Sequence, residues 1–269
     1  MWYIYVLCAV VLISLLTAFC YYENNGLSVT RLKVSSNKLT SAFSAVIISD
    51  LHGKIFKNDA LYKRIRWLKP DVIFFLGDSA DRSQNTVQMK KAAEFLSRLT
   101  NIAPVYAVSG NHEYGRLNRE ELFGLIKSGG VNLLRGEERT LNLNGQEIHV
   151  FGLDEVGYHI KTPGLLRRFS EREGFKILLS HFPERFKKDY INYDIDLTLS
   201  GHAHGGQFIL PFVGGIYSPG QGLFPKYYRG MYEENGKKLI VSRGLGNSRF
   251  PLRLFNRPEI IVADFIPKN

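Results

Sequence analysis

Metal-binding side chains recur in this chain directly after short apolar runs, and five such stretches hold five of the seven histidines. The stretches are Asp50-Leu51-His52, Gly77-Asp78, Gly110-Asn111-His112-Glu113, Ser180-His181 and, at a turn, Gly201-His202-Ala203-His204. The preceding runs predict buried strands at Ala45–Ser49, Val72–Leu76, Val105–Ser109, Ile177–Leu179 and Leu197–Leu199. Parallel strands end at one edge of a sheet, and open α/β folds place their ligand-binding sites at that edge. The pattern therefore predicts an α/β fold with one polynuclear metal centre.

The donor types in these stretches indicate which metals the centre would hold. Imidazoles mixed with oxygen donors suit Mn, Fe or Zn, whereas a structural zinc site would normally use cysteine thiolates. The two cysteines, Cys8 and Cys20, both lie in the apolar N-terminal stretch. A lone histidine beside an apolar run is usually a core or loop residue, so the prediction depends on the whole set.

Taken in order, the motifs D-x-H, G-D-x-x-D, G-N-H-E, a lone histidine after a strand and G-H-x-H resemble those of the calcineurin-like metallophosphoesterase superfamily. The resemblance extends from about Val46 to the C-terminus. Gly205-Gly206-Gln207 and Ser242-Arg243-Gly244-Leu245-Gly246 resemble the small bacterial membrane-associated branch. The resemblance implies two packed sheets with helices outside, a four-layer α-β-β-α sandwich.

The resemblance also implies a role for each matched residue. One metal would be bound by Asp50, His52, Asp78 and His204, and the other by Asp78, Asn111, His181 and His202. Asp78 would bridge two divalent ions, which would be Mn, Zn, Fe or Co. Two such ions lower the pKa of a bridging water and neutralise charge on an in-line phosphoryl transition state. The implied nucleophile is the bridging hydroxide.

Three further residues match parts of the family site other than the ligands. His112 is similar to the histidine that faces the leaving-group oxygen, where it would donate a proton or stabilise charge. Asp81 matches its acidic partner, although a loop aspartate capping the helix near Asn85 is the alternative. Arg82 resembles the phosphate-contacting arginine of the serine/threonine phosphatase branch, with a solvated loop arginine as the alternative.

Other polar residues carry weaker signals. Glu113 is expected to support the site rather than to catalyse, and His149 lies in a predicted strand and is expected to be structural. His159 lies in a polar loop that could line the substrate side.

The N-terminal segment predicts a membrane anchor at residues 1–22. Trp2–Tyr22 contains no charged side chain, and 21 helical residues span a bilayer core of about 30 Å. Aromatic residues bracket the segment. A cleaved signal peptide is the alternative, but a basic start and an A-x-A-like exit are missing. The first basic residues, Arg31, Lys33 and Lys38, follow the anchor, which favours a cytoplasmic catalytic domain.

The remaining chain divides into a tether with a first edge strand, residues 23–41, and a metallophosphoesterase domain, residues 42–269. We expect that domain to fold without the anchor. Helices are predicted at Asp59–Leu68, Thr86–Leu99 and Arg119–Lys127. Strands are predicted at Leu27–Val34, Leu141–Leu143, Glu147–Phe151, Gln207–Leu210, Lys238–Val241 and Glu259–Phe265, with a hairpin turn at Asn144-Gly145.

The formal charge of +10 lies wholly outside the anchor. Eight basic residues lie between Gln221 and Pro258: Lys226, Arg229, Lys237, Lys238, Arg243, Arg249, Arg253 and Arg257. They predict a basic surface that attracts anionic headgroups, with ordinary solubilising charge as the alternative. The basic-aromatic pattern of a nucleic-acid module is missing.

The leading functional hypothesis is a membrane-anchored, two-metal hydrolase of phosphodiesters, monoesters or pyrophosphates. An anionic lipid-linked or nucleotide-linked substrate suits the anchor and the basic run. The alternatives are a protein phosphatase with the same metal centre, suggested by Arg82, and a non-catalytic metal-binding membrane scaffold. The filled ligand positions argue against the scaffold.

Overall fold

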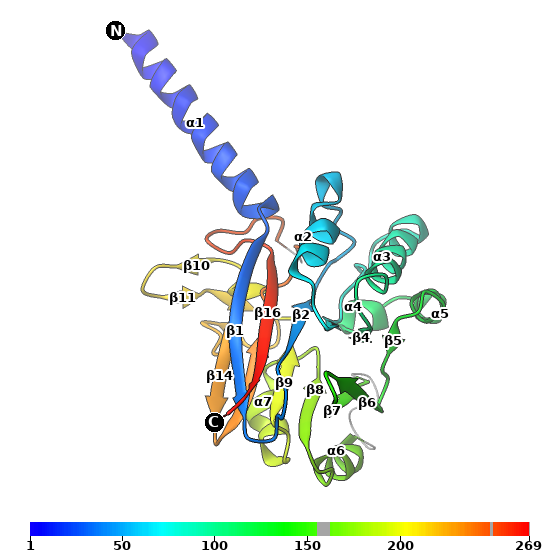
Figure 1. Ribbon diagram of the computed structural model, residues 1–269. Coiled ribbons are helices and arrows are strands. Elements are labelled where there is room, and N and C mark those ends of the chain that lie inside the picture. The colour runs from blue at the N-terminus through cyan, green and yellow to red at the C-terminus, as the bar shows by residue number, and fades with distance from the viewer. Residues whose placement is uncertain (155–161, 248–249, 269) are drawn as a thin grey trace.

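Two six-stranded sheets pack face to face in the computed structural model, which describes residues 1–154, 162–247 and 250–268 (Figure 1). In spatial order, the first sheet contains β1 (Ser28–Ser36), β16 (Glu259–Pro267), β2 (Phe43–Ile48), β3 (Val72–Leu76), β4 (Val105–Val108) and β5 (Asn132–Leu133). The second contains β14 (Gly230–Glu234), β15 (Lys237–Val241), β9 (Leu197–Ser200), β8 (Phe175–Leu179), β7 (Gln146–Gly152) and β6 (Glu137–Leu143).

Alternating side chains bury both faces of each sheet. Phe74 on β3 packs between the sheets, whereas its neighbours Ile73 and Phe75 face the helices. On β8, Ile177 packs between the sheets and Leu178 faces outward. The first sheet is covered by α2 (Ala60–Leu68), α3 (Thr86–Leu99) and α5 (Arg119–Ser128), and the second by α6 (Thr162–Ser170) and α7 (Arg185–Lys188). The predicted four-layer α-β-β-α sandwich is therefore confirmed.

The strands that carry the motifs run parallel within each sheet. In the first sheet β2, β3 and β4 are parallel neighbours, and in the second β8 and β9 are. Their carboxyl ends consequently lie at one edge, and the polar stretches that follow them meet there.

Several local elements differ from the predictions. The strand predicted at Gln207–Leu210 is only β10 (Ile209–Leu210), which pairs with β11 (Gly214–Gly215), and a 3-10 turn, η3 (His204–Gly206), precedes it. Helix α6 was not predicted, and its Pro163 lies in the first turn, where proline is compatible with a helix. The smaller elements are η1 (Lys57–Asp59), α4 (Asn111–Tyr114), η2 (Tyr190–Asn192), β12 (Tyr217–Ser218) and β13 (Gly222–Leu223).

Helix α1 (Trp2–Asn25) projects from the sandwich and is long and apolar enough to cross a membrane (Figure 1). It ends three residues after the predicted limit of the anchor at residue 22, and Glu23 is already buried against the domain. Strand β1 follows at once and pairs with β16 along nine residues. The boundary predicted at residue 42 would therefore separate β1 from the sheet to which it belongs.

A chain that begins at Ala42 should be unstable, contrary to the expectation from the sequence. It lacks β1, which exposes the edge of β16 and removes the fully buried Val34, worth about 1.5–3 kcal/mol by itself. A chain that begins at Leu27 keeps β1 and serves as the matched control. Denaturant midpoints of the two chains measure the difference, and equal midpoints would show that β1 contributes nothing.

Candidate metal centre

Two fully buried groups of donor atoms lie at the sheet edge that the motif-bearing strands share, beside a third, half-buried group of His52, Asp81 and His112. Asp50, His52 and His204 form one buried group, and Asp78, His181 and His202 form the other. Within each of these two groups the donor atoms lie within 4.8 Å of one another, and every one of their residues is buried. The structure therefore brings together residues that are up to about 150 positions apart, as His202 and Asp50 are, which the spacing of the motifs had predicted.

Asp78 lies between the two groups. Its Oδ2 is 3.2 Å from Nε2 of His181 in one group and 3.8 Å from Nε2 of His52 in the other. Across the first group, His52 Nε2 lies 3.3 Å from His204 Nε2, and across the second, His202 Nδ1 lies 3.2 Å from His181 Nε2. Two ligand atoms that each lie about 2.0–2.2 Å from the same ion are separated from each other by about the distances seen here. The arrangement fits two adjacent ions with Asp78 between them.

The imidazoles at the centre are held ready to bind a cation. Burial lowers the pKa of His202 to about 3, and burial likewise lowers the pKa values of His52 and His204, which favours the neutral form that binds metal. His181 Nδ1 donates to the Leu76 carbonyl oxygen at 2.7 Å, which turns Nε2 toward Asp78. Although burial opposes it, Asp78 raises the pKa of His181, so this position favours positive charge.

The side-chain oxygen of Asn111 lacks a hydrogen-bond partner among the residues that the structure describes, and a bound metal ion would take that place. This oxygen, Oδ1, is buried, and a buried polar atom without a partner is costly. The residue opens α4, immediately before His112, whose backbone N–H donates to Asp78 Oδ1 at 2.9 Å. A buried acceptor beside this carboxylate fits a cation ligand.

His112 and Asp81 form a pair beside the two groups. Nδ1 of His112 lies 2.5 Å from Oδ1 of Asp81, and the backbone N–H of Arg82 donates to the same oxygen at 2.9 Å. Burial opposes protonation of His112, but Asp81 and Asp78 outweigh it and raise the pKa of the ring. The alternative role for Asp81 is not observed, because Asn85 caps α3 with its own side chain.

Glu113 joins the loop that follows β3 to the loop that follows β4. Its carboxylate accepts from the backbone N–H groups of Asp78 (3.0 Å), Gly110 (2.9 Å) and Ser79. Burial raises the pKa of this carboxyl group. Glu113 thus supports the site, as expected.

Gly110→Ala should weaken metal binding without removing any donor. A Cβ at this position would lie 2.2 Å from Asp78 Oδ1, and the bonds of Glu113 leave the two loops little freedom to separate. We expect metal affinity to fall by about 10–100-fold, as when groups that orient ligands are lost. Calorimetric titration with Mn²⁺ measures the affinity. Gly124→Ala is the control, because a Cβ at position 124 meets nothing within 4 Å. Unchanged affinity would mean that the loops adjust freely.

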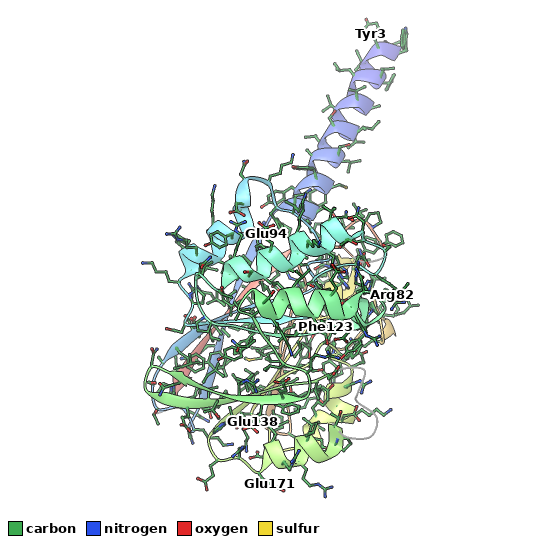
Figure 2. The ribbon with its side chains drawn as sticks, turned by 90° about the vertical axis from the view of Figure 1, so that its right-hand side faces the viewer. Tyr3, Arg82, Glu94, Phe123, Glu138 and Glu171 are labelled. Atoms are coloured by element: carbon green, nitrogen blue, oxygen red, sulfur yellow. The ribbon has the colours of Figure 1, made fainter. Side chains whose placement is uncertain are left out.

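The remaining predicted residues lie at the margin of the site or away from it. Arg82 is exposed at the surface, and its Nη2 donates to the Asn111 carbonyl oxygen at 3.4 Å (Figure 2). His149 lies on β7 and contacts Thr140, so it is remote from the two groups. His159 lies outside the described residues.

Several residues that hold the ligand loops, Gln84 and Asn256 among them, were not predicted. Gln84 accepts from the Asp81 backbone N–H at 2.9 Å and donates to the His52 carbonyl oxygen at 2.6 Å. Asn256 donates to the His204 carbonyl oxygen at 2.7 Å. The Gly246 backbone N–H bonds to the Asp50 carbonyl oxygen, so the Ser242–Gly246 stretch packs against the centre. These pairings arise only in three dimensions and have no local signal.

The predicted basic surface is only partly present. Arg253 is 1% exposed, and its guanidinium donates to the carbonyl oxygens of Gly246 and Arg243. Burial lowers the pKa of Arg253 to about 10. Arg243 pairs with the buried Glu259 at 2.9 Å, so these two arginines are structural. Arg249 lies outside the described residues.

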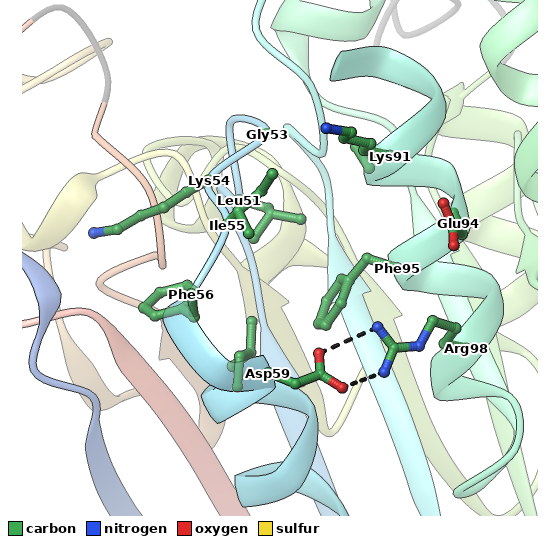
Figure 3. A pocket seen from close by; sticks show the side chains of 12 residues that line it. Leu51, Gly53, Lys54, Ile55, Phe56, Asp59, Lys91, Glu94, Phe95 and Arg98 are labelled. Atoms are coloured by element: carbon green, nitrogen blue, oxygen red, sulfur yellow. Dashed lines mark hydrogen bonds and ion pairs between the residues drawn. The ribbon is translucent and has the colours of Figure 1, made fainter. Parts of the chain in front are cut away.

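A pocket of about 250 Å³ lies next to the loop that carries His52 (Figure 3). Leu51, Ile55 and Phe95 line it, and an ion pair between Asp59 and Arg98 closes one end. It contains none of the predicted ligands.

Comparison with known proteins decides the family. Residues 43–206, more than half of the chain, match the calcineurin-like phosphoesterase family. The chain belongs to this family. An uncharacterized metallophosphoesterase of Aquifex aeolicus (strain VF5) is 32% identical over 262 residues, which cover 93% of this chain and 95% of that relative. The uncharacterized metallophosphoesterase YkuE of Bacillus subtilis (strain 168) is 36% identical over 198 residues, 72% of this chain and 67% of that relative.

A third relative has a name that states an activity. Phosphodiesterase YaeI of Escherichia coli (strain K12) is 27% identical to this phosphoesterase over 257 residues, 91% of each chain. Family membership and the clustered donors make the chain a metal-dependent phosphoester hydrolase.

Proposed function

We propose that the centre binds two divalent ions, Mn, Zn, Fe or Co, and hydrolyses a phosphoester at the membrane surface. The position of Asp78 Oδ2 between the two donor groups is the observation that carries this proposal. Asp50, His52 and His204 would complete one ion's ligands, and Asn111, His181 and His202 the other's. When bound, the ions would activate water and neutralise charge that develops on the phosphoryl group.

His112 would act on the leaving group. Its Nδ1 is engaged by Asp81, so Nε2 is the nitrogen left to donate a proton to the departing oxygen. Asp81 would hold the ring in this orientation and favour its protonated form. Arg82, exposed beside Asn111, would contact the phosphate.

The location and substrate follow from α1 and its surroundings. The helix would anchor the chain in a bilayer, and the basic residues after it favour a cytoplasmic catalytic domain. A domain fixed at the headgroups meets lipid-linked phosphoesters at high local concentration. An anionic lipid-linked diester or pyrophosphate is therefore the proposed substrate class, ahead of a nucleotide-linked one.

Chelation tests the metal requirement. The chain should hydrolyse a nitrophenyl phosphodiester or monoester, lose activity with a chelator and regain it when Mn, Zn, Fe or Co is added. Turnover unaffected by either treatment would exclude this chemistry and favour the scaffold. A lipid diester and a phosphopeptide, compared in parallel, separate the proposed substrate from the protein phosphatase alternative that Arg82 suggests.

A further inference from the structure

Exposed apolar side chains gather around the end of α1. They come from the loop before α2, from the β10–β11 hairpin and from the loop before β16. We call this set the membrane rim: Ile55, Leu210, Phe212, Val213, Leu252 and Phe255. Phe212 is 110% exposed and Ile55 69%, so water faces them in the isolated chain. Exposed apolar side chains that lie near one another often mark a protein or membrane interaction site.

Direct contacts join the loop before β16 to α1 and to the hairpin, and join the loop before α2 to α1. The Phe255 ring packs edge-on against Phe19 of α1, with centroids 5.6 Å apart. The backbone N–H of Ile209 on the hairpin donates to the Leu254 carbonyl oxygen at 3.0 Å. On the other side, Lys54, next to Ile55, donates to the Asn24 carbonyl oxygen. In Figure 1 the hairpin projects to the left of the sandwich, below the end of α1.

Helix α1 is fixed to the domain rather than flexibly tethered to it. Asn24 Oδ1 accepts from the Arg253 backbone N–H at 2.9 Å, and the Glu23 carboxylate accepts from the Asn256 backbone N–H at 2.9 Å. Glu23 is 6% exposed, so this contact is buried. The direction of α1 therefore sets the orientation of the rim.

The contacts of α1 also set the depth of the rim. Tyr21 and Tyr22 lie beside the cations of Lys57 and Arg257, a combination that suits the headgroup level. Phe19 lies further along α1 toward the apolar segment, and Phe255 packs against it. Phe255 therefore reaches past the headgroup level when α1 crosses a bilayer.

We propose that the membrane rim inserts into the acyl layer of the bilayer that α1 crosses. This inference rests on the proposed anchoring and deepens the proposed function. Asn256, next to Phe255, donates to the His204 carbonyl oxygen at 2.7 Å, so one hydrogen bond connects the rim to a proposed ligand loop. The metal centre is thereby held at the headgroups. Its substrate class is a phosphoester carried by a lipid of that same bilayer.

Spin-label accessibility in phosphatidylcholine vesicles tests the insertion on the full chain. Cys8 and Cys20 are first replaced by serine, and single cysteines are placed at Val10 in α1, at Phe212 in the rim and at Glu171, which lies far from α1 (Figure 2). Labels at positions 10 and 212 should favour collision with oxygen, and the label at 171 should favour a soluble nickel chelate. If the nickel chelate reaches the label at position 212 but not the label at position 10, insertion of the rim is wrong and the anchor still stands. Nickel access at 10 overturns the anchor and the rim with it.

Activity supplies a second measurement. Phe212→Asp should lower turnover of an acylated nitrophenyl phosphodiester in vesicles by about tenfold, because a charge is expelled from the bilayer. Turnover of a soluble nitrophenyl ester should stay unchanged, and Phe212→Leu, which remains apolar, should match the wild type on both. Equal turnover of the vesicle substrate by all three chains would overturn the proposal.

Discussion

Asp78→Asn should abolish activity and remove metal from the centre. The substitution keeps the size of the side chain and its Oδ1, which accepts from the His112 backbone N–H. It places an amide group where Oδ2 faces His181 and His52, and it removes a buried negative charge between two proposed cation sites. Bridging charge stabilisation of this kind is worth several kcal/mol, which corresponds to a loss of at least about 1000-fold in kcat/KM.

Elemental analysis and kinetics of the same preparation measure both effects. Asp264→Asn is the matched control, because Asp264 is an exposed residue of β16 that pairs with Arg31. It should retain full metal content and activity. An Asp78→Asn chain with wild-type metal content and turnover would show that Asp78 does not bridge.

His112→Ala should lose turnover while it keeps its metal. His112 forms a third, half-buried group with Asp81 and His52 beside the two buried donor groups, and we expect Asp81 to hold its ring for proton transfer. Loss of a positioned acid typically costs about 10²–10⁴-fold in rate. The loss should be largest for esters with poor leaving groups, since these need protonation most.

The control for this prediction is His149→Ala. His149 contacts Thr140 on β6 and lies away from the centre, so its loss should leave kcat unchanged. Asp81→Asn should reproduce part of the His112→Ala defect. A missing metal in the His112→Ala chain would instead make His112 a ligand.

The sequence predicted that the candidate ligands meet at one sheet edge because that placement follows from local pattern, whereas their assignment to two ions came from the family resemblance. Each ligand follows an apolar run, and the parallel order of β2, β3 and β4 brings Asp50, Asp78 and Asn111 to one edge. The roles of these residues remain proposals, but their proximity is observed. The hairpin turn at Asn144-Gly145 was likewise local and is present between β6 and β7.

The features that the sequence did not predict depend on contacts between distant segments. Arg253 looked like surface charge, since a basic residue gives no local sign that carbonyl oxygens will surround it. β1 was predicted as an edge strand, but its pairing with β16, which lies more than 200 residues away, was not. The attachment of α1 through Asn24 also depends on a contact with a distant segment, so it too had no local signal.

Metal titration of the chelated full-length chain tests the central claim most directly. Mn²⁺ is added stepwise while bound metal per chain and hydrolysis of a nitrophenyl phosphodiester are measured on the same samples. The two-ion centre predicts that activity appears with metal and reaches its plateau at two ions per chain. Full activity without metal, or a plateau at one ion per chain, would contradict it.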